Sequence, residues 1–118
     1  MKDLKISKEL ISEVLNIPKE SIMDIYTDGN YLLIRKTNSR VEEYNIYGFA
    51  FKCKKWLLKN NIAFTLNYYN DNSVQFYCEK YHLDIESDTE VEAIVKACNW
   101  ILEQNKWFYN NYKKRLNN

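Results

Sequence analysis

Hydrophobic residues recur at helical spacing in three segments of this chain. The first runs from Ser7 to Ile17, begins with a favoured N-cap residue and is stopped by Pro18. Residues 45–59 and 88–104 repeat the pattern, and each carries a cysteine on its apolar face and a tryptophan followed by two aliphatic residues. We therefore expect three amphipathic helices, each with one face in a shared core.

Runs rich in β-branched and aromatic residues lie between the helical segments. Asp28-Gly29 separates two such runs and is a strong hairpin signal, and Asn70-Asp71-Asn72 separates a second pair. The predicted strands are Ser21–Thr27, Tyr31–Thr37, Ala63–Tyr69 and Ser73–Glu79, with shorter strands at Val41–Tyr44 and Tyr81–Ile85.

The order of these elements, α-β-β-α-β-β-α, predicts an α+β fold in which helices pack on one antiparallel sheet of four to five strands. A chain of 118 residues with 46% hydrophobic residues forms a single domain, residues 1–118, and two glycines and one proline leave no flexible linker. Residues 106–118 form a basic, aromatic tail that either continues the last helix or makes a short separate element.

The sequence predicts a cytoplasmic protein without a catalytic centre. No apolar run follows the first lysines and none approaches the ~20 residues that span a bilayer, so we expect no signal peptide and no membrane contact. Cys53, Cys78 and Cys98 occupy core-facing positions, as reduced structural thiols do. Cys78 and His82 are the closest metal-ligand pair, but their spacing is not that of a zinc site. No Gly-rich elbow or phosphate loop accompanies the thiols or His82, so we expect no metal, no cofactor and no enzyme activity.

Charge is distributed unevenly although the net charge is only +1. Lys52, Lys55 and Lys59 share one outward face of the second predicted helix at i, i+3 and i+7, and Tyr47 and Phe51 lie on its flank. This helix contains no acidic residue. The face is either a solvated surface opposite a core stripe or a surface that contacts phosphates or acidic side chains.

The tail and the acidic segment 84–92 offer two further candidate surfaces. Five acids alternate along 84–92, where they either favour the positive end of a helix dipole or form a patch for a basic partner. Tyrosine and tryptophan beyond the needs of the core are typical of interfaces. The predicted partner-binding residues are Tyr47, Phe51, Lys52, Lys55, Lys59, Trp107, Tyr109 and Tyr112.

Two helical motifs resemble those of a known group of proteins. The segments are Asn45-Ile-Tyr47 with Lys52-Cys-Lys54 and Trp56, and Asp88-Thr-Glu90 with Glu92-Ala-Ile94 and Lys96-Ala-Cys-x-Trp-Ile-Leu102. They are similar to short, functionally uncharacterised proteins encoded in bacteriophages and prophages. The resemblance implies a phage or prophage setting and a layered α/β fold, and it transfers no catalytic residue.

Together these features favour a phage- or prophage-derived, non-enzymatic binding protein that acts in the bacterial cytosol by occupying a surface of a host protein machine. An anti-defence inhibitor, such as one that blocks a CRISPR nuclease, belongs to this hypothesis. The alternative is a nucleic-acid-binding accessory protein that uses the lysine face of helix 46–59 and the C-terminal tail. A homodimer is a further open arrangement, and a small thiol enzyme is the third hypothesis, which needs Cys53 or Cys78 exposed with a depressed pKa.

Overall fold

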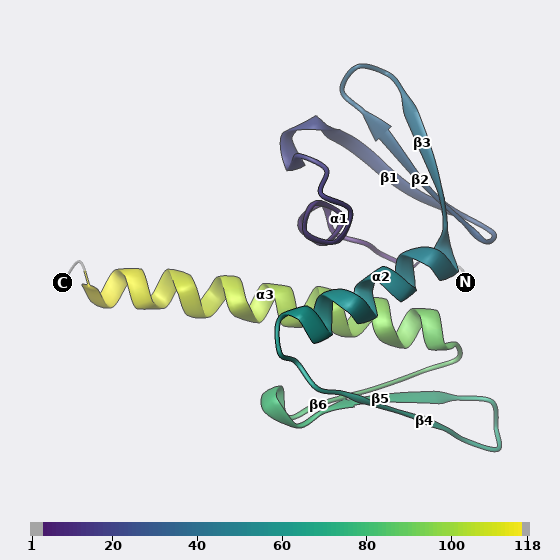
Figure 1. Cartoon of the computed structure of the whole chain (residues 1–118), viewed down its shortest axis with the longest axis vertical. Coiled ribbons are helices and arrows are strands. Elements are labelled where there is room, and N and C mark those ends of the chain that lie inside the picture. Colours follow the sequence, from purple (N-terminus) through teal and green to yellow (C-terminus); the bar gives the residue numbers. More distant parts are fainter. Residues whose placement is uncertain (1–3, 117–118) are drawn as a thin grey trace.

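The computed structural model describes residues 4–116, with side chains described as far as Asn105. Within this range, two three-stranded sheets lie on either side of a layer that contains α2 and α3 (Figure 1). The elements are α1 (Lys8–Leu15), β1 (Ile22–Asp28), β2 (Tyr31–Lys36), β3 (Val41–Asn45), α2 (Ile46–Lys59), β4 (Thr65–Tyr68), β5 (Val74–Cys78), β6 (Leu83–Ser87) and α3 (Glu90–Leu116), with short 3₁₀ turns at Lys19–Ser21 and Glu79–Tyr81.

The α+β class is confirmed, but the predicted single sheet of four to five strands in the order α-β-β-α-β-β-α is wrong. The strands form two separate antiparallel sheets, ordered β1-β2-β3 and β4-β5-β6. Both short segments considered as extra strands are full members, because β3 pairs with β2 and β6 pairs with β5. Helix α2 begins directly after β3 and carries the chain about 21 Å before the second sheet starts. The second hairpin forms its own sheet on the other side of the helices.

Local sequence explains where the elements begin and turn. In the first hairpin, Asp28 pairs with Tyr31 across a two-residue loop, and Gly29 has a φ of 58°, which glycine adopts without strain. Each predicted helix start is confirmed by a side chain that accepts hydrogen bonds from amides of the first turn. The pairs are Ser7 with Leu10, Asn45 with Tyr47 and Gly48, and Thr89 with Glu92.

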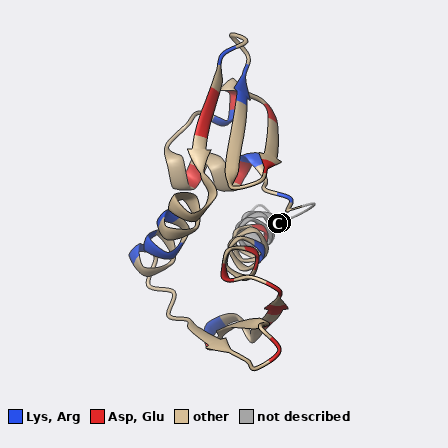
Figure 2. Ribbon diagram, turned by 90° about the vertical axis from the view of Figure 1, so that its right-hand side faces the viewer, with Lys and Arg blue, Asp and Glu red and all other residues tan. Residues whose placement is uncertain are grey.

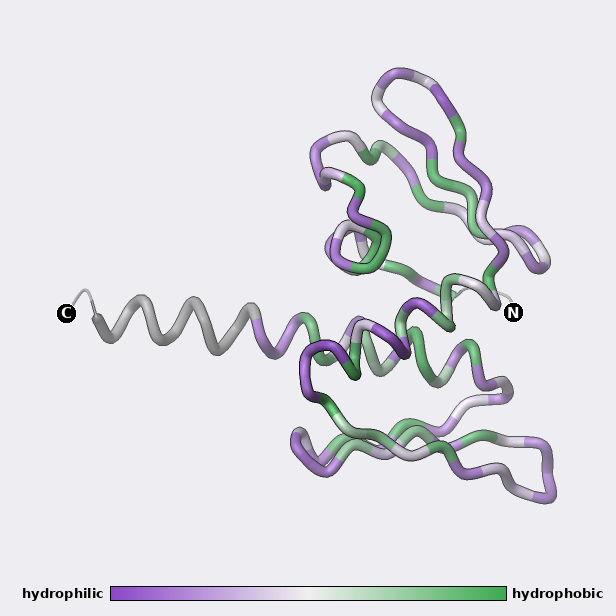
Figure 3. The backbone as a smooth tube through the Cα atoms, in the orientation of Figure 1, coloured by the Kyte–Doolittle hydropathy of each residue, from purple (hydrophilic) through white to green (hydrophobic). Residues whose placement is uncertain are grey.

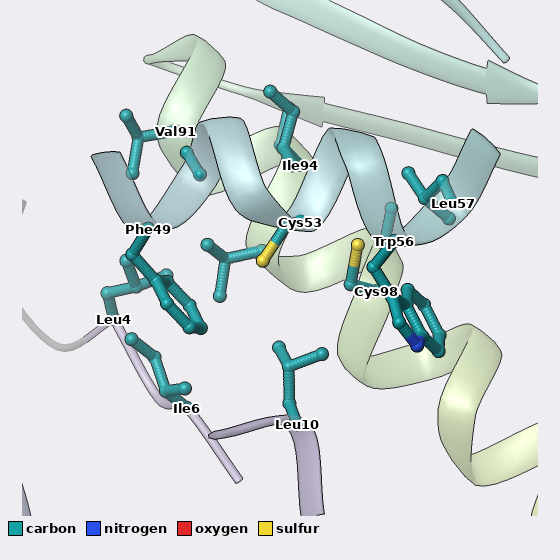
Figure 4. Packing of buried hydrophobic residues seen from close by; sticks show 14 of the residues in the cluster. Leu4, Ile6, Leu10, Phe49, Cys53, Trp56, Leu57, Val91, Ile94 and Cys98 are labelled. Carbon is teal, nitrogen blue, oxygen red and sulfur yellow. The ribbon is translucent and has the colours of Figure 1, made fainter. Parts of the chain in front are cut away.

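The core lies where α2, α3 and the N-terminal segment meet (Figure 4). Apolar and polar residues alternate along α2 with the period of a helix (Figure 3), and its predicted core stripe is buried throughout. Cys53 of α2 and Cys98 of α3 are both fully buried, and Leu32 and Phe76 cover the core from the two sheets. The buried residues of α2 are Ile46, Phe49, Ala50, Cys53, Trp56 and Leu57.

A polar cluster lies on the first sheet, between β2 and β3. Lys36 Nζ lies 2.6 Å from a carboxylate oxygen of Glu42, and the Tyr44 hydroxyl donates to the other oxygen. Burial raises the pKa of Tyr44 to about 12, and the hydrogen bond to Glu42 acts in the same direction. The hydrogen bonds from Lys36 and Tyr44 hold the pKa of Glu42 below its usual value.

Two adjacent leucines of α2 provide a matched test of this packing. Leu57 is fully buried, whereas Leu58 is 62% exposed. We expect Leu57→Ala to lower the free energy of unfolding by about 2–5 kcal/mol, because it leaves a cavity in the core. Leu58→Ala should change it by less than about 0.5 kcal/mol. Urea unfolding followed by tryptophan fluorescence measures both, and equal effects would contradict the orientation of α2.

The Tyr44 cluster predicts a specific loss of stability at alkaline pH. The pKa of Tyr44 is about 12 in the folded protein and about 10 in an unfolded chain, so the folded state disfavours its ionised form. The contribution of Tyr44 to the stability of the folded state is complete below pH 10 and is lost as the pH rises toward 12. The difference in unfolding free energy between the wild type and Tyr44→Phe should therefore shrink from pH 9 to pH 11.5 in urea titrations. Tyr26→Phe on the outer face of the sheet is the control, and a constant difference for Tyr44→Phe would refute the assignment.

Candidate partner-binding surface

The side of α2 that faces away from the core carries large apolar residues in a line. Tyr47, Phe51 and Leu58 follow one another at i, i+4 and i+11, so they lie on one flank of the helix. Their exposed fractions are 55%, 54% and 62%, although an apolar face of a helix normally packs against the protein. This flank is therefore an apolar surface that the fold itself leaves in solvent.

Three lysines lie beside this line and complete what we call the α2 surface. Lys55 Nζ lies 4.8 Å from the centroid of the Phe51 ring, a cation–π contact that joins the apolar flank to the lysine face. Within the part of the chain whose side chains are described, these lysines form no ion pair. The α2 surface consists of Tyr47, Phe51, Lys52, Lys55, Leu58 and Lys59.

The lysine face borders a shallow groove of about 200 Å³ between α1 and α2. Lys52, Lys55 and Lys59 line one side together with Trp56, which is itself nearly buried. Residues of α1 and its C-cap form the other side, and they include a single carboxylate among the lining residues. The groove therefore offers three ammonium groups within one concave surface. The residues from the side of α1 are Glu13, Val14 and Asn16.

Lys54, the fourth lysine of α2, has a different role. Its Nζ lies 3.3 Å from a carboxylate oxygen of Glu90 at the start of α3. Glu90 also accepts a hydrogen bond from Tyr68. Burial raises the pKa of the Tyr68 phenol, and the hydrogen bond to Glu90 acts in the same direction. Lys54 therefore links α2 to α3, whereas the other three lysines remain available to a partner.

The structure brings together five of the eight predicted binding residues, from Tyr47 to Lys59. Trp107, Tyr109 and Tyr112 lie outside the residues whose side chains are described. Leu58 was missing from the predicted set, although its spacing from Tyr47 and Phe51 was visible in the sequence. The contribution of α1 to the groove had no sequence signal, because it depends on how two distant helices pack.

The acidic segment 84–92 does not form one continuous patch. Asp84 and Glu86 are exposed on β6, and Gln75 donates a hydrogen bond of 2.8 Å to Asp84. Glu90 and Glu92 lie in the first turn of α3, where they favour the positive end of the helix dipole and contact Lys54 and Lys96. In Figure 2 the lysines form blue bands along α2, and the acids at the start of α3 are red on the neighbouring helix.

The thiols and the histidine do not assemble into a reactive centre. Cys53, Cys78 and Cys98 are all buried and free, which confirms their predicted core positions. A hydrogen bond between Cys53 and Cys98, together with burial, raises the pKa of Cys98 and so disfavours its nucleophilic thiolate. Among the described residues, no group of three or more His, Cys, Asp or Glu side chains is placed to hold a metal ion.

Comparisons with protein-family models, with curated proteins and with solved structures find no match for this chain. The resemblance to phage-encoded proteins therefore stays a prediction. None of the helices in the described part of the chain has the length and apolar character needed to cross a membrane.

Burial of the cysteines predicts that the native thiols react slowly. Cys53, Cys78 and Cys98 have exposed fractions of 0%, so a reagent reaches them only when the core opens. With an aromatic disulfide reagent at neutral pH, we expect three reactive thiols in denaturant and only slow labelling of the folded protein. Immediate labelling of Cys53 or Cys98 in the native state would contradict the packing of α2 against α3, and that of Cys78 would contradict the packing of β5 on the helices.

Proposed function

We propose that this chain is a non-enzymatic binding protein that presents the α2 surface to an acidic, partly apolar surface of another protein. The observation that carries the proposal is the contiguous exposure of Tyr47, Phe51 and Leu58 beside three lysines that have no ion-pair partner in the described part of the chain. A helix that served only to close the core would be expected to carry polar residues at these positions.

The chemistry of the α2 surface favours a protein partner with acidic side chains around an apolar patch. Burying aromatic and aliphatic side chains supplies affinity at about 25 cal/mol per Å² of apolar area. The lysines add complementarity to carboxylates, which raises the association rate and excludes basic partners. Phe51 and Leu58 then provide the central contacts, with Lys52, Lys55 and Lys59 at their rim.

The biological setting that we propose is that of a phage or prophage protein acting on a host protein machine, including as an anti-defence inhibitor of the anti-CRISPR type. Small size, the resemblance of the two helical motifs and the exposed surface support this setting. A protein that works by occupying a surface needs exposed contact residues, and α2 presents them on the face opposite its buried residues.

A nucleic-acid-binding accessory protein is the second candidate, and one observation favours it. Lys52, Lys55 and Lys59 line one groove, an arrangement that suits neighbouring phosphates. The two candidates differ in their response to nuclease and to salt, because phosphate contacts release counterions and make log affinity fall steeply with log salt.

The test is affinity purification of the tagged protein from nuclease-treated lysate of its bacterial host, followed by mass spectrometry. Phe51→Ala and the triple variant Lys52→Glu/Lys55→Glu/Lys59→Glu should each lose a stoichiometric partner of the wild type. With that partner purified, Phe51→Ala should weaken binding about tenfold, or ~1.4 kcal/mol, because it removes a central apolar contact. Both variants should keep the wild-type stability, since their side chains are exposed.

Matched controls separate the α2 surface from other exposed positions. Tyr31 is 49% exposed on the first sheet and Lys8 is exposed on α1, so Tyr31→Ala and Lys8→Glu should retain the partner. Recovery that depends on nucleic acid would favour the second candidate. A partner that all four variants retain equally would place the interface elsewhere and reject the proposal.

A further inference from the structure

A second hollow, separate from the α2 surface, lies between the 3₁₀ turn after β5 and the middle of α3. Its volume is about 530 Å³, within the range of small-molecule sites. The turn and α3 are far apart in the sequence but contribute equally to it. The lining residues are Lys80, Tyr81, His82, Trp100, Gln104 and Asn105.

Two aromatic rings form a corner in this hollow. The rings of Tyr81 and Trp100 are perpendicular, with an interplanar angle of 84° and centroids 6.1 Å apart. The Tyr81 hydroxyl donates a 2.7 Å hydrogen bond to Asn105 Oδ1, which fixes the phenol against α3. A flat ligand that stacks on one ring meets the edge of the other ring. Stacking and edge-to-face contacts are both favourable between aromatic groups. The corner is therefore already formed for a planar aromatic ligand.

The polar groups around the corner are one ammonium, one imidazole and two carboxamides. Lys80 Nζ lies 5.7 Å from the centroid of the Tyr81 ring. His82, the residue after Tyr81, adopts the left-handed conformation with a φ of 51° and ends the 3₁₀ turn at the hollow. Asn105 retains its amide N–H₂ group when its oxygen accepts from Tyr81. Among the lining residues whose side chains are described, none carries a carboxylate. Such a site suits a ligand that combines a flat ring carrying acceptors with a negative charge.

We propose that this hollow binds a nucleotide unit, with the base against Tyr81 and Trp100 and the phosphate beside Lys80 and His82. The amide groups of Gln104 and Asn105 face the edge of the base. The unit has the same chemistry in a free mononucleotide and in a single-stranded RNA or DNA. None of these residues belongs to the α2 surface, so the inference stands or falls independently of the proposed function.

Binding is tested with two probes on the full-length protein. AMP and UMP are titrated to millimolar concentration by calorimetry, and a fluorescein-labelled single-stranded decanucleotide is titrated by fluorescence anisotropy. We expect Trp100→Ala to weaken binding roughly 5- to 100-fold, because a base loses its stacking surface, and Trp100→Phe to restore most of it. Lys80→Ala should weaken binding and lower the salt slope for the oligonucleotide by about 0.7.

Lys80 is exposed, so Lys80→Ala tests the site even if Trp100→Ala fails to fold. If AMP or UMP binds the wild type and these variants lose that binding, the ligand is a free nucleotide. If only the oligonucleotide binds, the ligand is a single-stranded nucleic acid. Lys8→Ala is the control and should bind both probes like the wild type, because Lys8 is exposed on α1 and lies outside both this hollow and the α2 surface. The proposal is overturned if the wild type binds neither probe, if Lys80→Ala and a folded Trp100→Ala bind like the wild type, or if Lys8→Ala removes the binding.

Discussion

The contact between α2 and α3 is the interaction on which the rest of this structure depends. Each sheet is a three-stranded meander that lies entirely on one side of the helical layer. A three-stranded sheet is stable when its apolar face packs against another element, and here the helices provide that face for both. Separating α2 from α3 would therefore remove the support of the whole fold, not of one sheet alone.

Small side chains make this contact close. Cys53 on α2 and Cys98 on α3 are both fully buried, and their thiols interact directly. Short side chains at a helix contact let the backbones approach, so the long Leu57 and Ile94 fill the space beside them. At the periphery, Asn99 of α3 donates to the carbonyl oxygen of Lys5 and so ties the N-terminal segment to the same layer. That contact also sets where α1 lies beside α2, and hence where the groove forms.

Sequence reasoning succeeded where local rules decide the structure. The caps at Ser7, Asn45 and Thr89 and the core stripe of α2 depend on residues within one helix, and the structure confirms them. The number of sheets depends on whether the second hairpin pairs with the first, and no local signal encodes that choice. Ala93 and Ala97 likewise gave no signal, because alanine suits an exposed helix face as well as a buried one. The α2 residues of the candidate surface could be predicted, because their spacing within one helix decides which face they share. The groove and the hollow could not be predicted, because each forms where elements distant in the sequence pack together.

The composition of the α2 surface is itself an argument for binding. If solubility alone had shaped this face, the positions of Tyr47, Phe51 and Leu58 would favour short polar or charged side chains, and acids would alternate with the lysines to form i, i+4 pairs. The chain uses such pairing elsewhere, between Glu92 and Lys96 on α3, so its absence from the described α2 lysines is a property of this face. The contact of Lys55 with Phe51 covers part of one ring but leaves the residue half exposed. Apolar rings held in water carry a standing cost in solvation, and an acidic, partly apolar partner removes that cost while its carboxylates compensate the charge of the lysines.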